Sequence, residues 1–465
     1  MPTLNNAINV GLSGLMANQM GLNVTGQNIA NVNTEGYSRQ RAVFEANKPI
    51  LLGGHVFGTG VNLLDVVRTR DQFVDTQYRN ENKLLGYMEK KAESMDLIEG
   101  IINEPSDTGL HNSIKNFFNS LQDLATNPES SSVRTTVREQ GRTLAIMFNQ
   151  VWNQLDNISE NKNAEIYDKV SEINGILEQV GSLNLQISTT EALGAKANDL
   201  RDNRDRLLDS LSKLVDMSAY EDPANGSTTV SLSGQSFVVI DKVNLLRAES
   251  TNQDGKEVIR VINPIDNNPI KISAGELHGL LEIRDSIIPK LQQQIDELAS
   301  GIINEVNEVH RQGYGLLGIR STQPTKIDFF KGTDARTMKL SSQIENDPNN
   351  IAASKTGAPG DNTNALELAQ LRGKKVLNNE SFTFEDYYGG LISTFGLETV
   401  SVQEKLANQQ ILVEHFNNFR ETISGVNMDE ELINLIRFQK AFGANARVLT
   451  TVSEMMDIII QLGRY

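Results

Sequence analysis

Apolar and small side chains recur at alternating steps of four and three residues at both ends of this 465-residue chain. Such a repeat predicts an α-helix with one adhesive face. The amino-terminal stripe consists of Leu4, Ile8, Gly11, Leu15, Asn18, Leu22, Thr25, Ile29 and Val32. The carboxy-terminal stripe consists of Met428, Leu432, Leu435, Gln439, Phe442, Ala446, Leu449, Ser453, Met456 and Ile460. The simplest way to bury both stripes is to pack them together, which predicts an antiparallel pair of terminal helices.

The first 34 residues contain no ionisable side chain, although asparagine is frequent among them. Charge normally supplies the solubility of a surface helix, so amides in its place favour a packed interface, where they bond to neighbouring subunits and fix the register. Residues 33–36, Asn-Thr-Glu-Gly, are typical of a turn that ends the helix. The amino-terminal helix is therefore predicted to serve assembly.

The overall charge excludes two classes of partner. The net charge is −16 and the isoelectric point lies near 4.9, so the chain repels nucleic acid and anionic membranes.

No stretch approaches the roughly 18 consecutive apolar residues of a membrane span, so no membrane insertion is expected. The start of the chain lacks the basic and compact apolar segments of an ordinary signal peptide. There is no cysteine, which excludes disulfides and thiolate metal sites.

The interior of the chain is dominated by helical periodicity. Helices are predicted over 71–103, 110–125, 133–187, 200–214, 288–313, 364–372 and 383–424, and lengths of this kind favour a rod. Residues 217–273 instead show short alternating runs divided by Asn-Gly and Asp-Gly, which predicts a small β-rich outer domain. We expect a mainly α fold with β insertions. Its parts are a terminal coiled-coil domain (1–40 and 426–465), a helical body (41–216 and 274–425, with 314–362 irregular and carrying short strands) and the β-rich domain.

Candidate catalytic and ligand-binding groups are sparse. The five histidines lack zinc-ligand spacing, and His310 is expected at a helix end, facing the negative end of the dipole. Gly58 and Gly60 lack the third glycine of a dinucleotide loop and favour a turn. In the Arg- and Asp-rich run 200–207, charges four apart favour a solvated helix face laced with its own ion pairs, Arg201 with Asp205 and Asp202 with Arg206. We therefore predict no catalytic residue, cofactor or metal.

Particular motifs at both ends resemble a known family. The sequences 13–15 (Ser-Gly-Leu), 28–40 (Asn-Ile-Ala-Asn-Val-Asn-Thr-Glu-Gly-Tyr-Ser-Arg-Gln), 58–61 (Gly-Thr-Gly-Val) and 425–457 resemble the ends of flagellar rod, hook and hook-associated proteins. The interior sequences 200–208, 275–285, 306–310 and 365–369 resemble the body of the hook-associated proteins, which is itself flagellin-like. Hook-like ends on a flagellin-like body are typical of a junction subunit.

The resemblance implies a structural, non-enzymatic part of the bacterial flagellum that lies outside the cell, at the junction of hook and filament. The implied partners are the hook protein, hook-associated protein 3, further copies of the chain in a ring, and a flagellar export chaperone. It also implies export in an unfolded state through the flagellar type III system. A secreted coiled-coil effector or translocator and a true flagellin remain alternatives.

The predicted assembly interface combines members of the two stripes with motif residues. These are Leu4, Ile8, Leu15, Leu22, Asn28, Ile29, Asn31, Asn33, Gly36, Tyr37, Leu432, Leu435, Phe442, Ala446, Leu449, Met456 and Ile460. Because neither stripe has a stable partner on its own, we expect the ends to be poorly ordered in the free chain and to fold together on docking.

Overall fold

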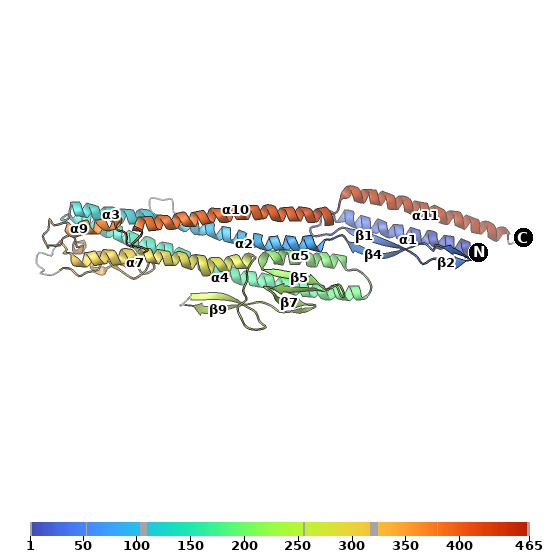
Figure 1. The fold of residues 1–465 in the computed structure, drawn as a ribbon, viewed down its shortest axis with the longest axis horizontal. Helices are drawn as coiled ribbons and strands as arrows, with labels where there is room; N and C mark the ends of the chain where they lie inside the picture. The colour runs from blue at the N-terminus through green and yellow to red at the C-terminus, as the bar shows by residue number, and fades with distance from the viewer. Residues whose placement is uncertain are drawn as a thin grey trace.

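The chain forms a long rod, with its two ends side by side at one tip (Figure 1). The computed structural model describes residues 2–52, 54–102, 109–253, 256–316, 324–378 and 380–462. A terminal unit occupies the tip that carries the chain ends, a bundle of long helices forms the body, and a small β domain lies on one side of the body. This is the predicted mainly α fold with β insertions.

The terminal unit is an antiparallel pair of helices lined by a β-hairpin. Helix α1 (Pro2–Ala30) packs along α11 (Met428–Leu462), with Gly11 beside Leu449 and Gly21 beside Phe438. Strand β1 (Gln40–Ala46) pairs with β4 (Val61–Arg68), and both strands contact α1. Strands β2 (Ile50–Leu52) and β3 (His55–Phe57) extend the hairpin outward.

The sequence indicated none of these four strands. It favoured a turn at Gly58 and Gly60, directly after β3, and placed residues from 41 onward in the helical body. Strand β3 is exposed throughout and β1 and β4 are mostly half-buried, so no clean alternation of apolar and polar residues marks them. The division of the chain into domains stays a prediction.

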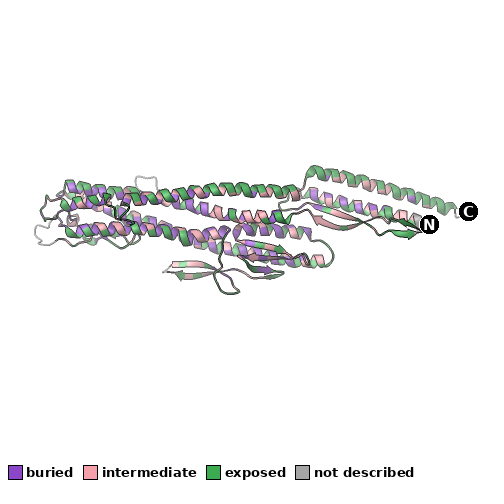
Figure 2. Cartoon of the chain, in the orientation of Figure 1, coloured by how far each residue is buried: buried purple, intermediate pink, exposed green. Residues whose placement is uncertain are grey.

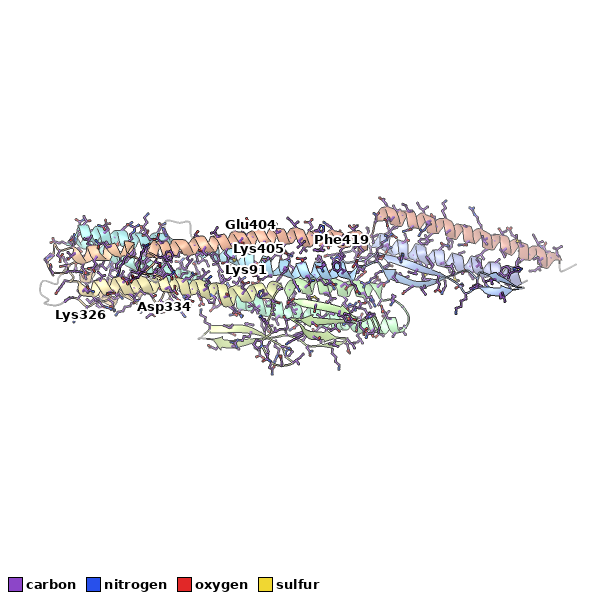
Figure 3. The ribbon with its side chains drawn as sticks, viewed as in Figure 1. Lys91, Lys326, Asp334, Glu404, Lys405 and Phe419 are labelled. Carbon is purple, nitrogen blue, oxygen red and sulfur yellow. The ribbon has the colours of Figure 1, made fainter. Side chains whose placement is uncertain are left out.

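The body consists of long helices that run nearly parallel to the rod. They are α2 (Gln72–Ile102), α3 (Leu110–Thr126), α4 (Ser131–Ala192), α5 (Asn198–Leu214), α6 (Glu276–Glu282), α7 (Ile288–Gln312) and α10 (Phe384–Ser424), with a π-helical turn (Ile283–Ile287) joining α6 to α7. At 1.5 Å per residue, the 62 residues of α4 span about 90 Å. Lys91 on α2, labelled in Figure 3, bonds to Glu282 on α6 and so joins two of these helices.

Short elements close the body at the tip far from the chain ends. They are β11 (Phe330–Lys331), β12 (Lys339–Leu340), α8 (Ser342–Asn346), α9 (Thr363–Gln370) and two 3₁₀ turns, Pro348–Asn350 and Leu371–Gly373. Five buried phenylalanines pack in contact with one another there: Phe117, Phe118, Phe329, Phe330 and Phe384. The aromatic cluster fixes this end of the bundle.

His310 is part of the core at this tip. The side chain lies in the last turn of α7, as expected, but it is fully buried. Its Nδ1 bonds to the carbonyl of Ile327 (2.8 Å) and its Nε2 accepts the amide of Ala352 (2.9 Å). Burial lowers the pKa of His310 to about 4, so the ring is neutral. The predicted dipole-facing histidine is wrong, because the chain after α7 folds back and covers the helix end.

The β domain is a four-stranded antiparallel sheet with a separate hairpin. The sheet has the order β5 (Met217–Glu221), β6 (Thr228–Leu232), β7 (Gln235–Val239), β8 (Lys242–Val243), and the hairpin pairs β9 (Arg247–Gln253) with β10 (Lys256–Ile262). Val230, Leu232 and Phe237 are buried in one cluster with apolar residues of α4. The helix thus serves as the second layer of the domain.

Asparagine amides on α4 hold the β domain at three points. Asn163 donates to the carbonyl of Glu257 (2.7 Å) and accepts from the amide of Ile259 (3.2 Å). Asn174 makes the same pair of bonds with the backbone of Leu246. Asn184 donates to the carbonyls of Thr228 and Ile240 and accepts from the amide of Thr228. Each side-chain amide therefore supplies both a donor and an acceptor to the backbone of the β domain.

Candidate assembly interface

The most buried face of α1 is a stripe of small residues. Its members are Gly11, Gly14, Ala17, Gly21, Thr25 and Asn28. A Cβ added to Gly21 would lie 2.7 Å from the ring of Phe438, and one added to Gly14 would lie 2.9 Å from the side chain of Asn445. The glycines therefore let α11 approach the backbone of α1 more closely than larger residues would allow.

Helix α11 presents a different set of residues to α1 than the repeat predicted. Its inward positions include Glu431, Phe438, Asn445 and Val452, one residue before the predicted 432, 439, 446 and 453. Ile460 is 52% exposed and Leu432 is 44% exposed, so neither is buried against α1. The predicted seam is wrong at 432, 439, 453 and 460, which are exposed, whereas Ala446 is half-buried. The ring of Phe438 packs onto Gly21. The repeat alone gave no reason to prefer Phe438 over Gln439 at this turn.

The remaining predicted stripe residues lie at the margins of the seam. Leu4, Ile8, Leu15, Leu22 and Ile29 on α1, and Leu435, Phe442, Ala446, Leu449 and Met456 on α11, are half-buried. Leu449 contacts α1 beside Gly11. These side chains are placed to contribute both to the helix pair and to a second surface.

The outer faces of the terminal unit are apolar. Helix α1 exposes Val10, Leu12, Met16 and Met20, and the hairpin exposes Leu51 and Val56. Helix α11 exposes Ile433, Ile436, Val448, Met455, Ile458, Ile459 and Leu462. Figure 2 shows the exposed surface running along α11 and α10, and Figure 3 places the half-exposed Phe419 on α10 near α11. Exposed apolar side chains in this number on one unit are typical of an interaction site.

Asn28 opens the motif 28–40 in the last turn of α1, and it is 1% exposed. Its Nδ2 donates to the carbonyl of Gln40 (2.9 Å) and to Glu431 Oε2 (3.1 Å). Its Oδ1 accepts from the amide of Gln40 (3.0 Å) and from the hydroxyl of Tyr37 (2.9 Å). Burial raises the pKa of the Tyr37 phenol, so this proton stays available as a donor. The amide joins α1, the following turn, β1 and α11.

The other motif residues shape the turn. Gly36 has a φ of +78°, a left-handed conformation that favours glycine. The hydroxyl of Thr34 donates to Asn31 Oδ1 (3.1 Å), and Asn31 Nδ2 donates back to the carbonyl of Gln27 (3.0 Å). Asn33 is exposed. Of the three predicted asparagines, Asn28 and Asn31 therefore bond within the chain, whereas Asn33 faces outward.

Glu431 anchors the first turn of α11. Its side chain is 3% exposed and lies between Asn28 and the guanidinium of Arg39, whose Nε donates to Glu431 Oε1 (2.9 Å). Arg39 also pairs with Glu430 (2.8 Å), and its amide donates to the carbonyl of Ser424 (2.8 Å) at the end of α10. Glu431 lies one residue before the predicted stripe position 432, so the repeat did not include it.

The terminal unit is joined to the body through the run 200–207 of α5. Asp202 accepts from the amide and hydroxyl of Ser38 (2.9 and 2.7 Å) and from Arg68 (2.7 Å). Asp205 accepts from Arg68 (2.8 Å). The predicted self-laced, solvated helix face is wrong. These acids face Arg68 of β4 and Ser38, which lies between α1 and β1, because the terminal unit covers this side of α5.

Arg70 just before α2, Arg79 on α2 and Arg420 on α10 extend this ionic joint. Arg70 and Arg79 lie 3.2 Å from Asp205, and Asp209 pairs with both Arg79 (2.7 Å) and Arg420 (2.6 Å). Burial alone would raise the pKa of Asp205, but Arg70, Arg79 and Arg68 outweigh it and hold the pKa well below its usual range. Asp205 is therefore ionised at neutral pH.

Arg201 and Arg204 point the other way, toward the β domain. Both pair with Glu221 of β5, and Arg201 also pairs with Glu191 (2.8 Å). Arg204 is fully buried and donates to Asn184 (3.1 Å) and to the carbonyl of Gly226 (2.6 Å). Helix α5 thus connects the terminal unit on one side with the β domain on the other.

Within the described ranges, no group of three or more His, Asp or Glu side chains is arranged to hold a metal ion. The described helices also include none that is long and apolar enough to cross a membrane.

Comparison with known proteins identifies the parts separately. Residues 95–330 match the family model of the flagellar hook-associated protein FlgK helical domain. Residues 8–37 match the model described as flagella basal body rod protein, and residues 421–462 match the carboxy-terminal model of the flagellar basal body rod FlgEFG proteins. The two terminal matches cover most of α1 and all of α11.

Whole-chain relatives agree with these matches. Flagellar hook-associated protein 1 of Bacillus subtilis is 33% identical, with 96% of each chain covered. The protein of the same name from Escherichia coli is 26% identical, over 99% of this chain and all of the relative. The solved structure of the flagellar hook junction protein FlgK from Burkholderia pseudomallei has a TM-score of 0.64 at 16% identity. It covers 74% of this chain and all of that chain, and it shows the shared fold.

The chain is therefore a structural, non-enzymatic component of the axis of the bacterial flagellum, outside the cell. More narrowly, it belongs to the flagellar hook-associated protein 1 (FlgK) family.

Proposed function

We propose that this chain forms the junction between hook and filament. It assembles as a ring on the distal end of the hook and carries hook-associated protein 3 on its outer side. The observation that supports this most directly is the terminal unit, in which a tightly packed helix pair leaves apolar side chains exposed on both helices. Such faces are buried when copies pack side by side around an axis.

The attachment of this unit to the body supports the same role. A junction transmits force between hook and filament, so its two parts need a stiff connection. The ionic joint of Arg68, Arg79 and Arg420 with Asp205 and Asp209 supplies one, since each partner is largely buried. The relatives' names, flagellar hook-associated protein 1 and hook junction protein, point to the same position.

Export follows from the same proposal. The chain passes unfolded through the flagellar type III channel, with a dedicated chaperone covering an exposed terminal segment. The exposed and half-buried members of the predicted interface, from Leu4 to Ile460, are then covered between copies and against the hook protein.

Deletion and complementation test the proposal. Cells without the protein are expected to keep hooks, lose filaments and release flagellin into the medium. Leu15→Asp and Leu449→Asp variants should be exported but absent from hooks, with the body folded by circular dichroism. Leu193→Asp is the matched control, because Leu193 is 85% exposed in the turn after α4. Normal motility with the two seam variants would overturn the proposal.

The alternatives give different outcomes. A secreted effector or translocator would be found free in the medium, with filaments intact in the deletion strain. A flagellin would polymerise alone into long filaments, and purified chain at high concentration tests this directly.

A further inference from the structure

The terminal helix pair has a repeat that does not by itself define one register. Gly14 and Gly21 on α1 are seven residues apart, and so are the α11 residues that face them, Asn445 and Phe438. A shift of α11 by one heptad would place Phe438 or Val452 opposite Gly14, where the absence of a side chain accommodates either. Small-residue packing therefore leaves the register open.

One polar contact in the seam is specific. Asn28 Nδ2 and Glu431 Oε2 lie 3.1 Å apart, although 403 residues separate them in the sequence. A buried carboxylate is costly unless it is paired, and Glu431 is paired with both Asn28 and Arg39. A one-heptad shift would leave Glu431 opposite Gly21, or Asn28 opposite Phe438, without these partners.

The site demands an asparagine at position 28. The amide uses both of its hydrogens, on Gln40 and Glu431, and both acceptor positions of its oxygen, for Gln40 and Tyr37. Aspartate offers the two acceptors but no donor, and leucine offers neither. Glutamine carries one methylene more, which a site with a hydrogen-bond partner at each of the four amide positions does not accommodate.

We propose that Asn28 and Glu431, together called the register clamp, are positioning residues that fix the register of the terminal helix pair within a single chain. Gln40 and Ser38 carry the same alignment into the body, since Gln40 Nε2 donates to Asp199 (2.9 Å) and Ser38 to Asp202. The apolar outer faces of α1 and α11 are thereby presented in one fixed relation to the body. The inference concerns the isolated chain, so it stands independently of the junction role.

Disulfide trapping in the full-length chain tests the proposal, because the natural sequence contains no cysteine. Gly14→Cys with Asn445→Cys reports the observed register, since a Cβ on Gly14 lies within 3.0 Å of the Asn445 side chain. Gly14→Cys with Phe438→Cys, and Gly14→Cys with Val452→Cys, report the two shifted registers. When Asn28 and Glu431 are unchanged, mild oxidation should yield mainly the cross-link between positions 14 and 445.

Adding Asn28→Leu or Glu431→Leu should reduce the ratio of observed-register to shifted-register cross-links by roughly tenfold, as expected for the loss of a hydrogen bond to a charged group. Asn9→Leu, an exposed asparagine on α1, is the matched control and should leave the ratio unchanged. Fluorescence of Trp152, the single tryptophan and a buried residue of the body, confirms that each variant remains folded.

Two results would overturn the inference. In the first, the clamp variants keep the same cross-link preference as the parent chain. In the second, the clamp-intact chain forms all three cross-links with similar yield. Because neither measurement uses hooks or filaments, failure here leaves the proposed function untouched, and failure of complementation leaves the register clamp untouched.

Discussion

Arg68, the last residue of β4, donates from Nη1 to Asp205 on α5 across 2.8 Å, and this pair lies where the terminal unit meets the body. Asp205 is 8% exposed and also faces Arg70 and Arg79. Neutralising it would leave these guanidinium groups near one another without their common counter-ion.

We expect Asp205→Asn to lower the free energy of unfolding by about 3–5 kcal/mol, the usual cost of removing one partner of a buried ion pair. Urea denaturation of the full chain measures the change. Asp168→Asn on the exposed face of α4 is the control and should have an effect within about 0.5 kcal/mol. Equal stability of the two variants would show that the ionic joint contributes nothing.

His310 gives the chain a mildly acid-sensitive core. Its folded pKa, about 4, lies below the unfolded value of about 6.5, so the unfolded chain binds the proton more readily. The stabilisation is complete above pH 6.5 and is lost as pH falls from 6.5 toward 4, by about 3 kcal/mol. The free energy of unfolding should therefore decline over this window. A His310→Gln variant, although less stable, should show a flatter profile between pH 6.5 and 4.

Asn184 is predicted to be the strongest of the three amides that hold the β domain. Asn184→Leu removes three backbone bonds and one partner of the buried Arg204, so we expect destabilisation by about 2–4 kcal/mol. Limited proteolysis should then cut first within residues 217–262. Asn161→Leu, at an exposed position of the same helix, should leave the cleavage pattern unchanged.

The long helices could be predicted because their periodicity is a local property. The expected helix over 383–424 agrees with α10 to within one residue, and the helix over 200–214 agrees with α5 to within two. The β-rich insertion could be predicted for the same reason, since its short apolar or alternating runs are divided by turn sequences.

Residues that act across long distances in the sequence could not be predicted in this way. The charges of 200–207 look solvated when read along one helix, and only the packing of β4 and α2 on that helix reveals Asp202 and Asp205 as a joint. Glu431 is charged, and its partners Asn28 and Arg39 are almost the whole chain away. The motif from Asn28 to Gln40 marked the right region without giving its geometry.

Gly21 and Gly26 on α1 distinguish a glycine that close helix packing requires from one that it does not. Gly21 faces Phe438, whereas an added Cβ on Gly26 meets nothing within 4 Å. Gly21→Ala should push α11 outward and reduce incorporation into hooks. Gly26→Ala should be neutral or stabilise α1 by up to about 1 kcal/mol, because alanine favours the helix. Complementation and thermal unfolding of both variants test the contrast, and equal effects would contradict the close-packed seam.

Order in the free terminal unit should decrease from the body outward. Of the described residues in α11, Glu431 and Val452 are the buried ones, and Ile458, Ile459 and Leu462 at the outer tip are strongly exposed. Hydrogen exchange of the free chain should therefore show slow amides near Asn28 and Glu431 and fast amides beyond Val452. This refines the expectation that the ends fold on docking, since it confines coupled folding to the tip.

After incorporation into hooks, the amides of the tip should exchange more slowly as their apolar side chains become covered. Uniformly fast exchange along α11 in the free chain would show that the clamp does not hold the helix, whereas fast tip exchange in assembled hooks would show that the tip is not part of the assembly interface.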